Sequence, residues 1–324
     1  MMRAIIGLAA AVAGIVSIAM PVHAQQYPVR PVRFVVPFAP GGSTDTLART
    51  LGHKLADVFG QQVVVDNRPG GHGNIGMEIV ARAAPDGHTI VLAYIANLAI
   101  APSLFGKLPF DPVKDYAPVT QIATSPNVLT AHPSVHATGL KELIALVKAK
   151  PGAVSFASTG VASIGHLTGE LLNSLGGMQM THVPYKGGGQ AIIGLLGGHV
   201  QVMFSGFTAA MPHIKSGKIR ALAVTGAKRS PALPEVATIA EQGFPGVEAT
   251  AWYGVLAPAK TPNSVIGRFH AETVKALKLP DVSERLTSLG FEIVGSTPQE
   301  FAAYIQTETR KWEKVVRISG AKPD

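Results

Sequence analysis

A glycine turn between a buried strand and a helix is the feature that most constrains this chain. Residues Val32 to Phe38 are apolar and partly β-branched, which predicts a buried strand. Apolar residues then recur at helical spacing, and Gly60 is placed to end that helix. The turn between them reads Pro37-Phe38-Ala39-Pro40-Gly41-Gly42-Ser43-Thr44-Asp45. The sequence therefore predicts a strand, a glycine turn and a helix from Asp45 to Phe59.

This turn is suited to bind an anion. The helix can be capped by Ser43, Thr44 or Asp45. Its first amides lack acceptors within the helix and lie at the positive end of the helix dipole. Gly41 and Gly42 have no side chains that would keep a ligand from the backbone. We therefore expect an anion site at this strand end, with an ordinary strand-to-helix turn as the alternative. No lysine follows Gly42, which excludes a Walker-type phosphate loop.

The N-terminal segment, residues 1–24, has the pattern of a secretory signal peptide. Arg3 is followed by an apolar run from Ala4 to Met20, and a small residue, Ala24, ends the segment. We expect cleavage after Ala24 and location in the periplasm. An N-terminal membrane anchor is the alternative, but the apolar run is short for one.

Composition limits the chemistry that the rest of the chain can perform. The chain has no cysteine, so disulfides and thiolate metal sites are unavailable. The formal net charge is +8, which favours acidic small molecules, anionic membrane surfaces or nucleic acid as partners. The basic residues are scattered rather than clustered, and we therefore expect no nucleic-acid partner. A mature chain of about 300 residues has room for two domains.

Strands and helices alternate along two regions of the chain, which predicts an α/β fold with parallel strands and helices on both faces. The first region adds strands Gln62–Asp66 and Thr89–Ala93 to the opening unit. Residues Pro102 to Pro118 are predicted to form a connection. The second region repeats the order of strand, glycine–hydroxyl loop and helix, with strands predicted at Val154–Ala157, Met180–Val183, Val200–Phe204 and Ile219–Thr225. Ligands collect at the carboxyl ends of such strands.

The end of the chain is predicted to return to the first region. The apolar run Ala249–Ala257 is long enough to serve two lobes. Thr297 and Glu300 form a capping box for a helix that ends near Ile318. We therefore expect a discontinuous first lobe, 25–124 plus 249–324, and a second lobe, 125–248.

A glycine motif at Gly71–Gly76 has the G-x-G-x-x-G spacing of dinucleotide-binding proteins. It follows the second strand of its unit rather than the first, and no acidic residue lies about 20 positions on to bind a ribose. We therefore expect no cofactor, and we interpret the motif as a second glycine-lined strand end.

A serine hydrolase is the enzyme alternative. Ser163 lies close to a G-x-S-x-G pattern that lacks its first glycine, and His166 is too near in the chain to act as a base from another strand. A helix N-cap is the favoured role for Ser163. The histidines are dispersed, and Pro133 separates His132 from His136, so no metal site is expected.

Polar groups follow three strands of the second region. Lys186 can neutralise a carboxylate, and the hydroxyl groups can donate hydrogen bonds to one. These residues are Ser158, Thr159, Ser163, Tyr185, Lys186 and Ser205. No plausible catalytic acid–base pair accompanies them, which favours a binding protein with no catalytic residue.

The chain resembles the Bug (TctC) family of periplasmic solute receptors for tripartite tricarboxylate transporters. The resemblance covers nearly the whole mature chain, in order. It is carried by Tyr27-Pro28, by Val36 to Asp45, by Asn67-Arg68-Pro69-Gly70, by Gly73-Asn74-Ile75-Gly76, by His166-Leu167, by His182 to Gly188, and by Ala221-Leu222-Ala223-Val224-Thr225.

The resemblance implies a two-lobed periplasmic-binding-protein-like (type II) fold with a ligand cleft between the lobes. It implies a monomer that delivers a small carboxylate to membrane-embedded transporter subunits. The predicted ligand-binding residues are Phe38, Gly41, Gly42, Ser43, Thr44, Asp45, His72, Tyr94, Ser158, Thr159, Ala162, Ser163, Tyr185, Lys186, Gly187 and Ser205.

Two positions depart from the family pattern and leave the ligand open. The family usually has glycine where this chain has His72, and many members carry an acid at the position of Ser205. Succinate, citrate, an amino-acid carboxylate and an aromatic acid all remain candidate ligands. A carboxylate sensor for a signalling pathway is the alternative to a transport receptor.

Overall fold

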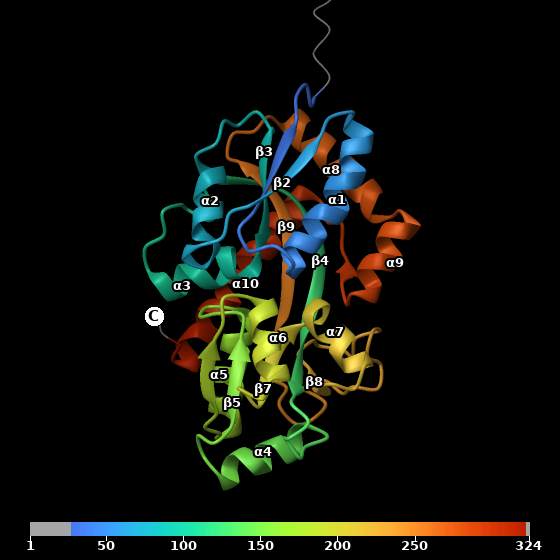
Figure 1. The fold of residues 1–324 in the computed structure, drawn as a ribbon. Helices are drawn as coiled ribbons and strands as arrows, with labels where there is room; N and C mark the ends of the chain where they lie inside the picture. The colour runs from blue at the N-terminus through green and yellow to red at the C-terminus, as the bar shows by residue number, and fades with distance from the viewer. Residues whose placement is uncertain (1–26, 322–324) are drawn as a thin grey trace, which may run out of the picture.

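The computed structural model describes residues 27–321, and the predicted signal peptide lies outside the described residues. Figure 1 shows an upper and a lower part joined by long strands. We call the part that contains the first strands of the chain the first lobe, and the other part the second lobe. In the part of the chain that the structure describes, no helix is both long and apolar enough to cross a membrane.

The first lobe begins with the predicted alternation. Strand β1 pairs in parallel with both β2 and β3, and helices follow β1 and β2. In chain order the elements are β1 (Val32–Val36), α1 (Ser43–Phe59), β2 (Val63–Asn67), the 3-10 turn η1 (Gly71–Gly73), α2 (Asn74–Ala81) and β3 (Thr89–Tyr94). As predicted, Gly60 ends α1 with φ 61°, and its amide donates to the carbonyl oxygen of Ala56.

The second lobe has its own parallel strands. Strand β5 lies between β6 and β7 and pairs in parallel with both. The elements are α4 (Leu140–Ala149), β5 (Ser155–Ser158), α5 (Ile164–Gly176), β6 (Thr181–Pro184), α6 (Gly188–Leu196), β7 (Val202–Gly206), α7 (Phe207–Lys215) and β8 (Arg220–Val224).

Two long strands connect the lobes. Strand β4 (Tyr116–Ala131) pairs with β9 (Thr250–Pro258) from Tyr116 to Pro126, and with β7 and β8 from Asn127 to Ala131. Strand β9 also pairs with β3, so one sheet continues through both lobes. Strand β9 covers most of the apolar run Ala249–Ala257, and a role for this run in both lobes stays a prediction.

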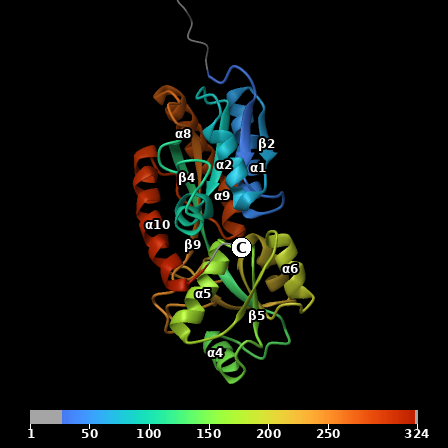
Figure 2. The same ribbon diagram turned by 90° about the vertical axis from the view of Figure 1, so that its left-hand side faces the viewer.

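The C-terminal elements pack along the first lobe. They are α8 (Asn263–Leu277), α9 (Pro280–Ser288), β10 (Glu292–Ile293), which pairs with β4, and α10 (Pro298–Ser319). The predicted capping box is present, because Thr297 Oγ1 accepts from the Glu300 amide and Glu300 accepts from the Thr297 amide. Figure 2 shows α10 running down the side of the first lobe to α5 of the second.

Several sequence predictions of local structure are wrong. The predicted connection Pro102–Pro118 includes part of α3 (Ala101–Phe105), which continues the π-helix η2 (Ala96–Ile100), and the start of β4. Helices α7 and α9 were not predicted. Helix α4 begins after Gly139, and the Thr138 hydroxyl before it donates to the carboxylate of Glu142.

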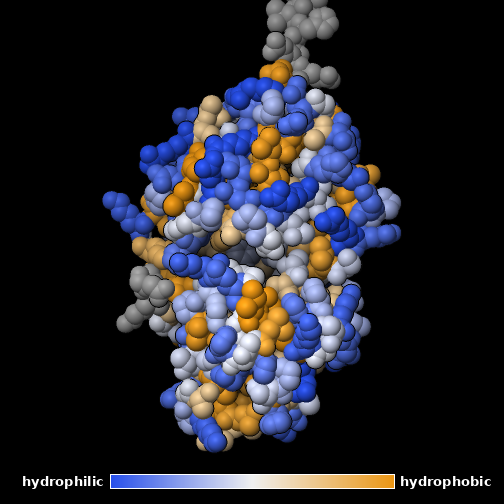
Figure 3. Space-filling view, in the orientation of Figure 1, coloured by the Kyte–Doolittle hydropathy of each residue, from blue (hydrophilic) through white to orange (hydrophobic). Residues whose placement is uncertain are grey.

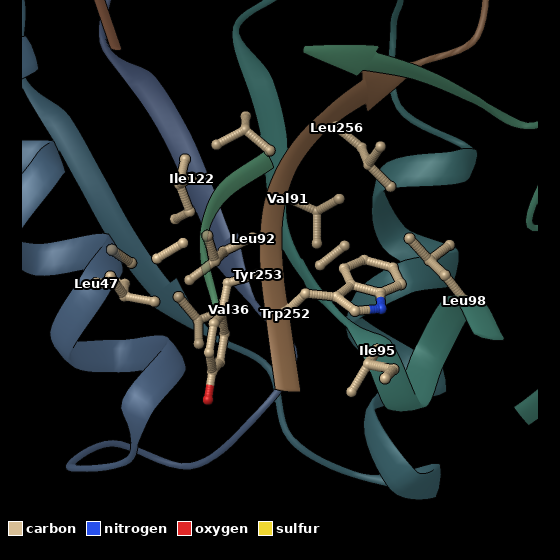
Figure 4. Close-up of a cluster of buried hydrophobic side chains, with 14 of the residues drawn as sticks. Val36, Leu47, Val91, Leu92, Ile95, Leu98, Ile122, Trp252, Tyr253 and Leu256 are labelled. Atoms are coloured by element: carbon tan, nitrogen blue, oxygen red, sulfur yellow. The ribbon is translucent and has the colours of Figure 1, made fainter. Parts of the chain in front are cut away.

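The first lobe has one apolar core around the junction of β3, β4 and β9. Trp252 is 0% exposed and lies in this core with residues of β1, β3, α1 and η2. Figure 4 shows Tyr253, its neighbour in β9, with its hydroxyl pointing away from the packed side chains. The second lobe packs on two smaller clusters, one on each face of its sheet.

Candidate functional site

A hollow lies at mid-height on one face of the molecule, between the two lobes (Figure 3). The starts of three helices meet at this junction. Helices α1 and α7 touch through a hydrogen bond between Ser43 and Thr208. The start of α5 also packs against the first lobe, since Val161 and Ala162 belong to the core cluster of that lobe. The strand ends of both lobes therefore converge on one place.

The first glycine turn ends differently from the prediction. Gly42 caps α1 with extended backbone and no side-chain cap, so none of the three residues that follow it is the cap. The reason is that the Asp45 carboxylate reaches back and accepts the amide of Gly41 at 3.0 Å. Gly41 has φ 86°, a conformation that favours glycine.

Asp45 holds this turn from the inside. Its carboxylate also accepts from Asn67 Nδ2 and from Arg49 Nε, both at 3.0 Å. Burial acts to raise the pKa of Asp45, but hydrogen bonds from Arg49, Gly41 and Asn67 outweigh it and hold the pKa below its usual value. Asp45 is thus an ionised brace between the loops that follow β1 and β2.

The second glycine loop is η1 and the start of α2. The carbonyl oxygen of His72 accepts from Asn97 Nδ2 at 3.0 Å, and a side chain at Gly73 would lie 2.5 Å from that same nitrogen. A side chain at Gly76 would lie 2.8 Å from the Cα of Pro37. The glycine motif is explained by this close packing of loops.

His72 lies on the outside of this loop. It is exposed and has φ 56°, and its ring packs on Phe105 with 5.0 Å between ring centroids. The contact with Phe105 is enough to explain the position of the His72 ring. A role for His72 in limiting ligand size stays a prediction.

Aromatic rings stand behind the first turn. Phe38 packs edge-on against Tyr94 at 5.6 Å between centroids, and Tyr94 packs on Tyr253 at 5.2 Å. Burial raises the pKa of Tyr94 well above its ordinary value. Burial also raises the pKa of Tyr253, to about 12, against the opposing effect of a hydrogen bond with Ser43. Both phenols are therefore neutral at physiological pH. Sequence reasoning missed Tyr253, although it is a polar ring within the apolar run.

Ser158 is locked inside the second lobe. It is 0% exposed, and its hydroxyl donates to the carbonyl oxygen of Gly160 at 2.9 Å. His182 Nε2 lies 2.7 Å from Ser158 Oγ. Because the single hydroxyl proton is used on Gly160, His182 is the donor of this second bond. The two bonds fix the loop rather than leave the hydroxyl free for a ligand.

His166 and His182 support the loop together. Their rings stack with 4.0 Å between centroids. The Ala162 amide donates to His166 Nδ1 at 3.4 Å, and Ala162 has φ 62°. Ser163 caps α5 by accepting the backbone amide of His166 at 3.3 Å. Ser163 is thus the helix cap that the sequence favoured.

The remaining predicted residues of the second lobe lie in different surroundings. Thr159 and Lys186 are exposed, and Gly187 precedes α6 with φ 112°. The Tyr185 ring packs over Gly194 of α6, where a side chain would lie 2.3 Å from its hydroxyl. Ser205 is 0% exposed, and its hydroxyl has no hydrogen-bond partner within residues 27–321.

The junction also contains a residue that sequence reasoning missed. Thr208 Oγ1 lies 2.8 Å from Ser43 Oγ and joins α7 of the second lobe to α1 of the first. Gly206, two residues before Thr208, leaves room for this contact, since a side chain there would lie 3.3 Å from Ser43 Oγ. Thr208 was missed because α7 itself was not predicted.

Comparison with known proteins gives the chain a family. Residues 47–320 match the model of the tripartite tricarboxylate transporter family receptor, TctC. The chain is 40% identical to Protein BugT of Bordetella pertussis over 320 residues, which is 98% of this chain and 97% of that protein.

Two solved structures from Rhodopseudomonas palustris share the fold over their whole length. One, solved with adipate, is 35% identical with a TM-score of 0.88, and the match covers 92% of this chain and 100% of that one. The other, MatC with bound malate, is also 35% identical with a TM-score of 0.84, and the match covers 90% and 100% of the two chains.

The structural neighbours have the two-lobed fold of periplasmic binding proteins, as the sequence predicted. They are solute-binding receptors rather than enzymes, which agrees with the prediction that the chain is a binding protein. The chain therefore belongs to the TctC family of tripartite tricarboxylate transporter receptors, which includes the Bug proteins.

Proposed function

We propose that this protein is a periplasmic receptor that captures a small dicarboxylate between its lobes for a tripartite tricarboxylate transporter. One observation carries the proposal. Helices α1 and α7, from different lobes, begin within one hydrogen bond of each other at Ser43 and Thr208. Both present the positive ends of their dipoles to the same junction, and an anion placed there is stabilised by both.

The chemistry of the relatives supports the choice of ligand class. Adipate and malate, which are bound in two structures of similar proteins, are both small dicarboxylates. The positive charge of this chain favours acids of this kind. We further propose that residues 1–24 direct export, and that the first lobe comprises 25–124 plus 249–324 and the second 125–248.

Under this proposal, the predicted ligand-binding residues have three different roles. The amides of Gly42, Ser43 and Thr44 bind one carboxylate, because they head α1 and need acceptors. Asp45, Ser158 and the two stacked histidines hold the loops in place. The exposed Lys186 attracts the acid without a fixed contact.

The ligand is identified by native mass spectrometry of freshly purified protein, followed by calorimetric titration with malate, adipate, succinate and citrate. We expect a co-purified acid, and micromolar or tighter binding of at least one dicarboxylate. Protein that carries no acid and binds none of the four would contradict the proposal.

The position of the ligand is tested by Gly42→Val. Gly42 has φ −87°, which valine accepts, and only the carbonyl oxygen of Ala39, at 4.0 Å, is near the site of a new Cβ. The variant should therefore fold, while its methyl groups crowd the amides. We expect at least a tenfold loss of affinity, because a lost hydrogen bond to a charged acceptor costs about 1.5–3 kcal/mol. Gly267→Val in α8, with nothing within 4 Å, is the matched control and should bind as the wild type does.

A further inference from the structure

The hydroxyl of Ser43, a predicted ligand-binding residue, is engaged by the other lobe. Ser43 Oγ lies 2.8 Å from Thr208 Oγ1, and the two residues are 165 positions apart in the chain. Each is half-buried at the start of its helix, α1 or α7. The bond therefore exists only while the lobes are together.

Tyr253 fixes one side of this contact. Its ring is 3% exposed between Tyr94 and Phe291, and Ser43 is the neighbour that acts to lower the pKa of its phenol. Tyr253 lies in β9, at the core of the first lobe, and gives Ser43 a polar neighbour on that side. Figure 4 shows its hydroxyl directed away from the core.

A second contact brings the same helix of the second lobe against the first. Phe207, the residue before Thr208, is 0% exposed and packs on Gly290, which lies between α9 and β10. A side chain at Gly290 would lie 2.4 Å from the Cβ of Phe207. Phe207 thus seats the start of α7 so that the Thr208 hydroxyl meets Ser43.

The electrostatics of the junction explain why such a contact is useful. The positive ends of α1 and α7 repel each other when no anion lies between them. A neutral hydroxyl pair brings no charge to the junction, and it offsets part of this repulsion.

We propose that Thr208 and Ser43 form a latch that stabilises the closed arrangement of the lobes and so sets how tightly the ligand is held. Thr208 is a positioning residue, because it acts through Ser43 to hold α7 of the second lobe against α1 of the first. The inference rests on the proposed closure of the lobes around a ligand, but it does not depend on which acid binds. A typical net hydrogen bond corresponds to roughly a two- to tenfold change in the ratio of closed to open molecules.

The test measures closure without any ligand. The chain has no cysteine, so cysteines introduced at two exposed positions, Val58 in α1 and Ile193 in α6, carry a unique pair of spin labels. Bound acid is first removed by unfolding and refolding. Pulsed electron paramagnetic resonance then measures the distance between the two labels. The distance distribution gives the ratio of closed to open molecules for wild type and variants.

We expect Thr208→Val to lower this ratio roughly two- to tenfold, and Thr208→Ser, which keeps the hydroxyl, to preserve it. Thr208→Ala serves as a second variant if valine disturbs α7. Thr307→Val, which removes an exposed hydroxyl of α10, is the matched control. Ser43→Ala combined with Thr208→Val should lower the ratio no further than either change alone, because both remove the same bond.

An unchanged ratio in both Thr208→Val and Thr208→Ala would overturn the latch, and so would additive effects in the double variant. Malate and adipate are then added to the same labelled proteins. If Thr208→Val opens the empty protein but neither acid closes any of the proteins, the latch stands and the proposed ligand class fails.

Discussion

Two adjacent glycines of the first turn serve different purposes. Gly41 has φ 86°, a conformation that is strained for any residue with a Cβ. Gly42 has φ −87°, which any residue adopts, so its missing side chain gives access to the amides instead. The sequence shows both glycines but not which one the backbone needs.

This difference predicts two separate effects on stability. Gly41→Ala should lower the free energy of unfolding by about 1–2 kcal/mol, because alanine is strained at positive φ. Gly42→Ala should change it by less than about 0.5 kcal/mol. Urea unfolding followed by circular dichroism measures both. Equal losses in the two variants would show that the turn has a different conformation.

His182 makes the stability of the second lobe depend on pH. Burial lowers its pKa from 6.5 to about 3, and the charge of the neighbouring His166 acts in the same direction. Between these values the unfolded chain binds a proton that the folded protein does not. Stability is therefore highest above pH 6.5 and falls as the pH decreases towards 3.

We expect His182→Gln to weaken this dependence while the glutamine amide still reaches Ser158. Melting temperatures of wild type and variant, recorded from pH 7 to pH 3, should converge as the pH falls. His53→Gln, at an exposed histidine of α1, should leave the wild-type profile unchanged. Parallel profiles for wild type and His182→Gln would show that His182 does not cause the pH dependence of stability.

At the scale of elements, the alternation of strands and helices was predictable and the crossing strand was not. Strand β4 contains Pro118 and Pro126, which argue against a strand, and its register shifts twice against β9. Helix α7 contains Pro212 in its interior, which hides its helical pattern. These elements are held by pairing and packing between distant segments, which local sequence does not report.

Helix α10 is fastened to β9 by one buried carboxylate. Glu308 Oε2 accepts from Trp252 Nε1 at 3.1 Å and from Trp312 Nε1 at 3.0 Å, and Glu308 is 6% exposed. Glu308→Ala leaves two buried indole donors without an acceptor, and each costs about 1–3 kcal/mol.

We therefore expect Glu308→Ala to lower the free energy of unfolding by about 2–5 kcal/mol. These are the only two tryptophans of the chain, so their fluorescence reports unfolding at this contact. Glu313→Ala, at an exposed position of the same helix, is the control and should be nearly neutral. A Glu308→Ala protein as stable as the control would exclude this role.

At the scale of the whole molecule, the lobes share a sheet and meet at a junction that the sequence located only in part. The glycine turn and the Ser158–Ser163 loop were predicted because glycine and hydroxyl residues follow apolar strands. Tyr253 and Thr208 were missed because their positions depend on how β9 and α7 pack. The site therefore depends on tertiary contacts more than the fold class does.

Closure predicts a change in size. Scattering should give a smaller radius of gyration with saturating acid than for refolded, acid-free protein, because binding shifts the population towards the closed form. Thr208→Val should show a larger difference than wild type, since more of it is open before binding. An identical radius with and without acid in that variant would contradict movement of the lobes.

The most direct test asks whether the ligand lies on the amides at the start of α1. Ser43 is the first residue of that helix, where proline is tolerated, so Ser43→Pro removes one amide hydrogen without breaking the helix. Ser43→Ala is its matched control, because both variants lose the hydroxyl that meets Thr208. Circular dichroism confirms that both are folded.

The decisive measurement is calorimetric titration of these two variants with the acid found on the purified protein. Ser43→Pro should bind roughly ten- to hundredfold more weakly than Ser43→Ala, since only the proline variant lacks an amide donor to the carboxylate. Equal affinities in the two variants would mean that the ligand does not lie on this turn.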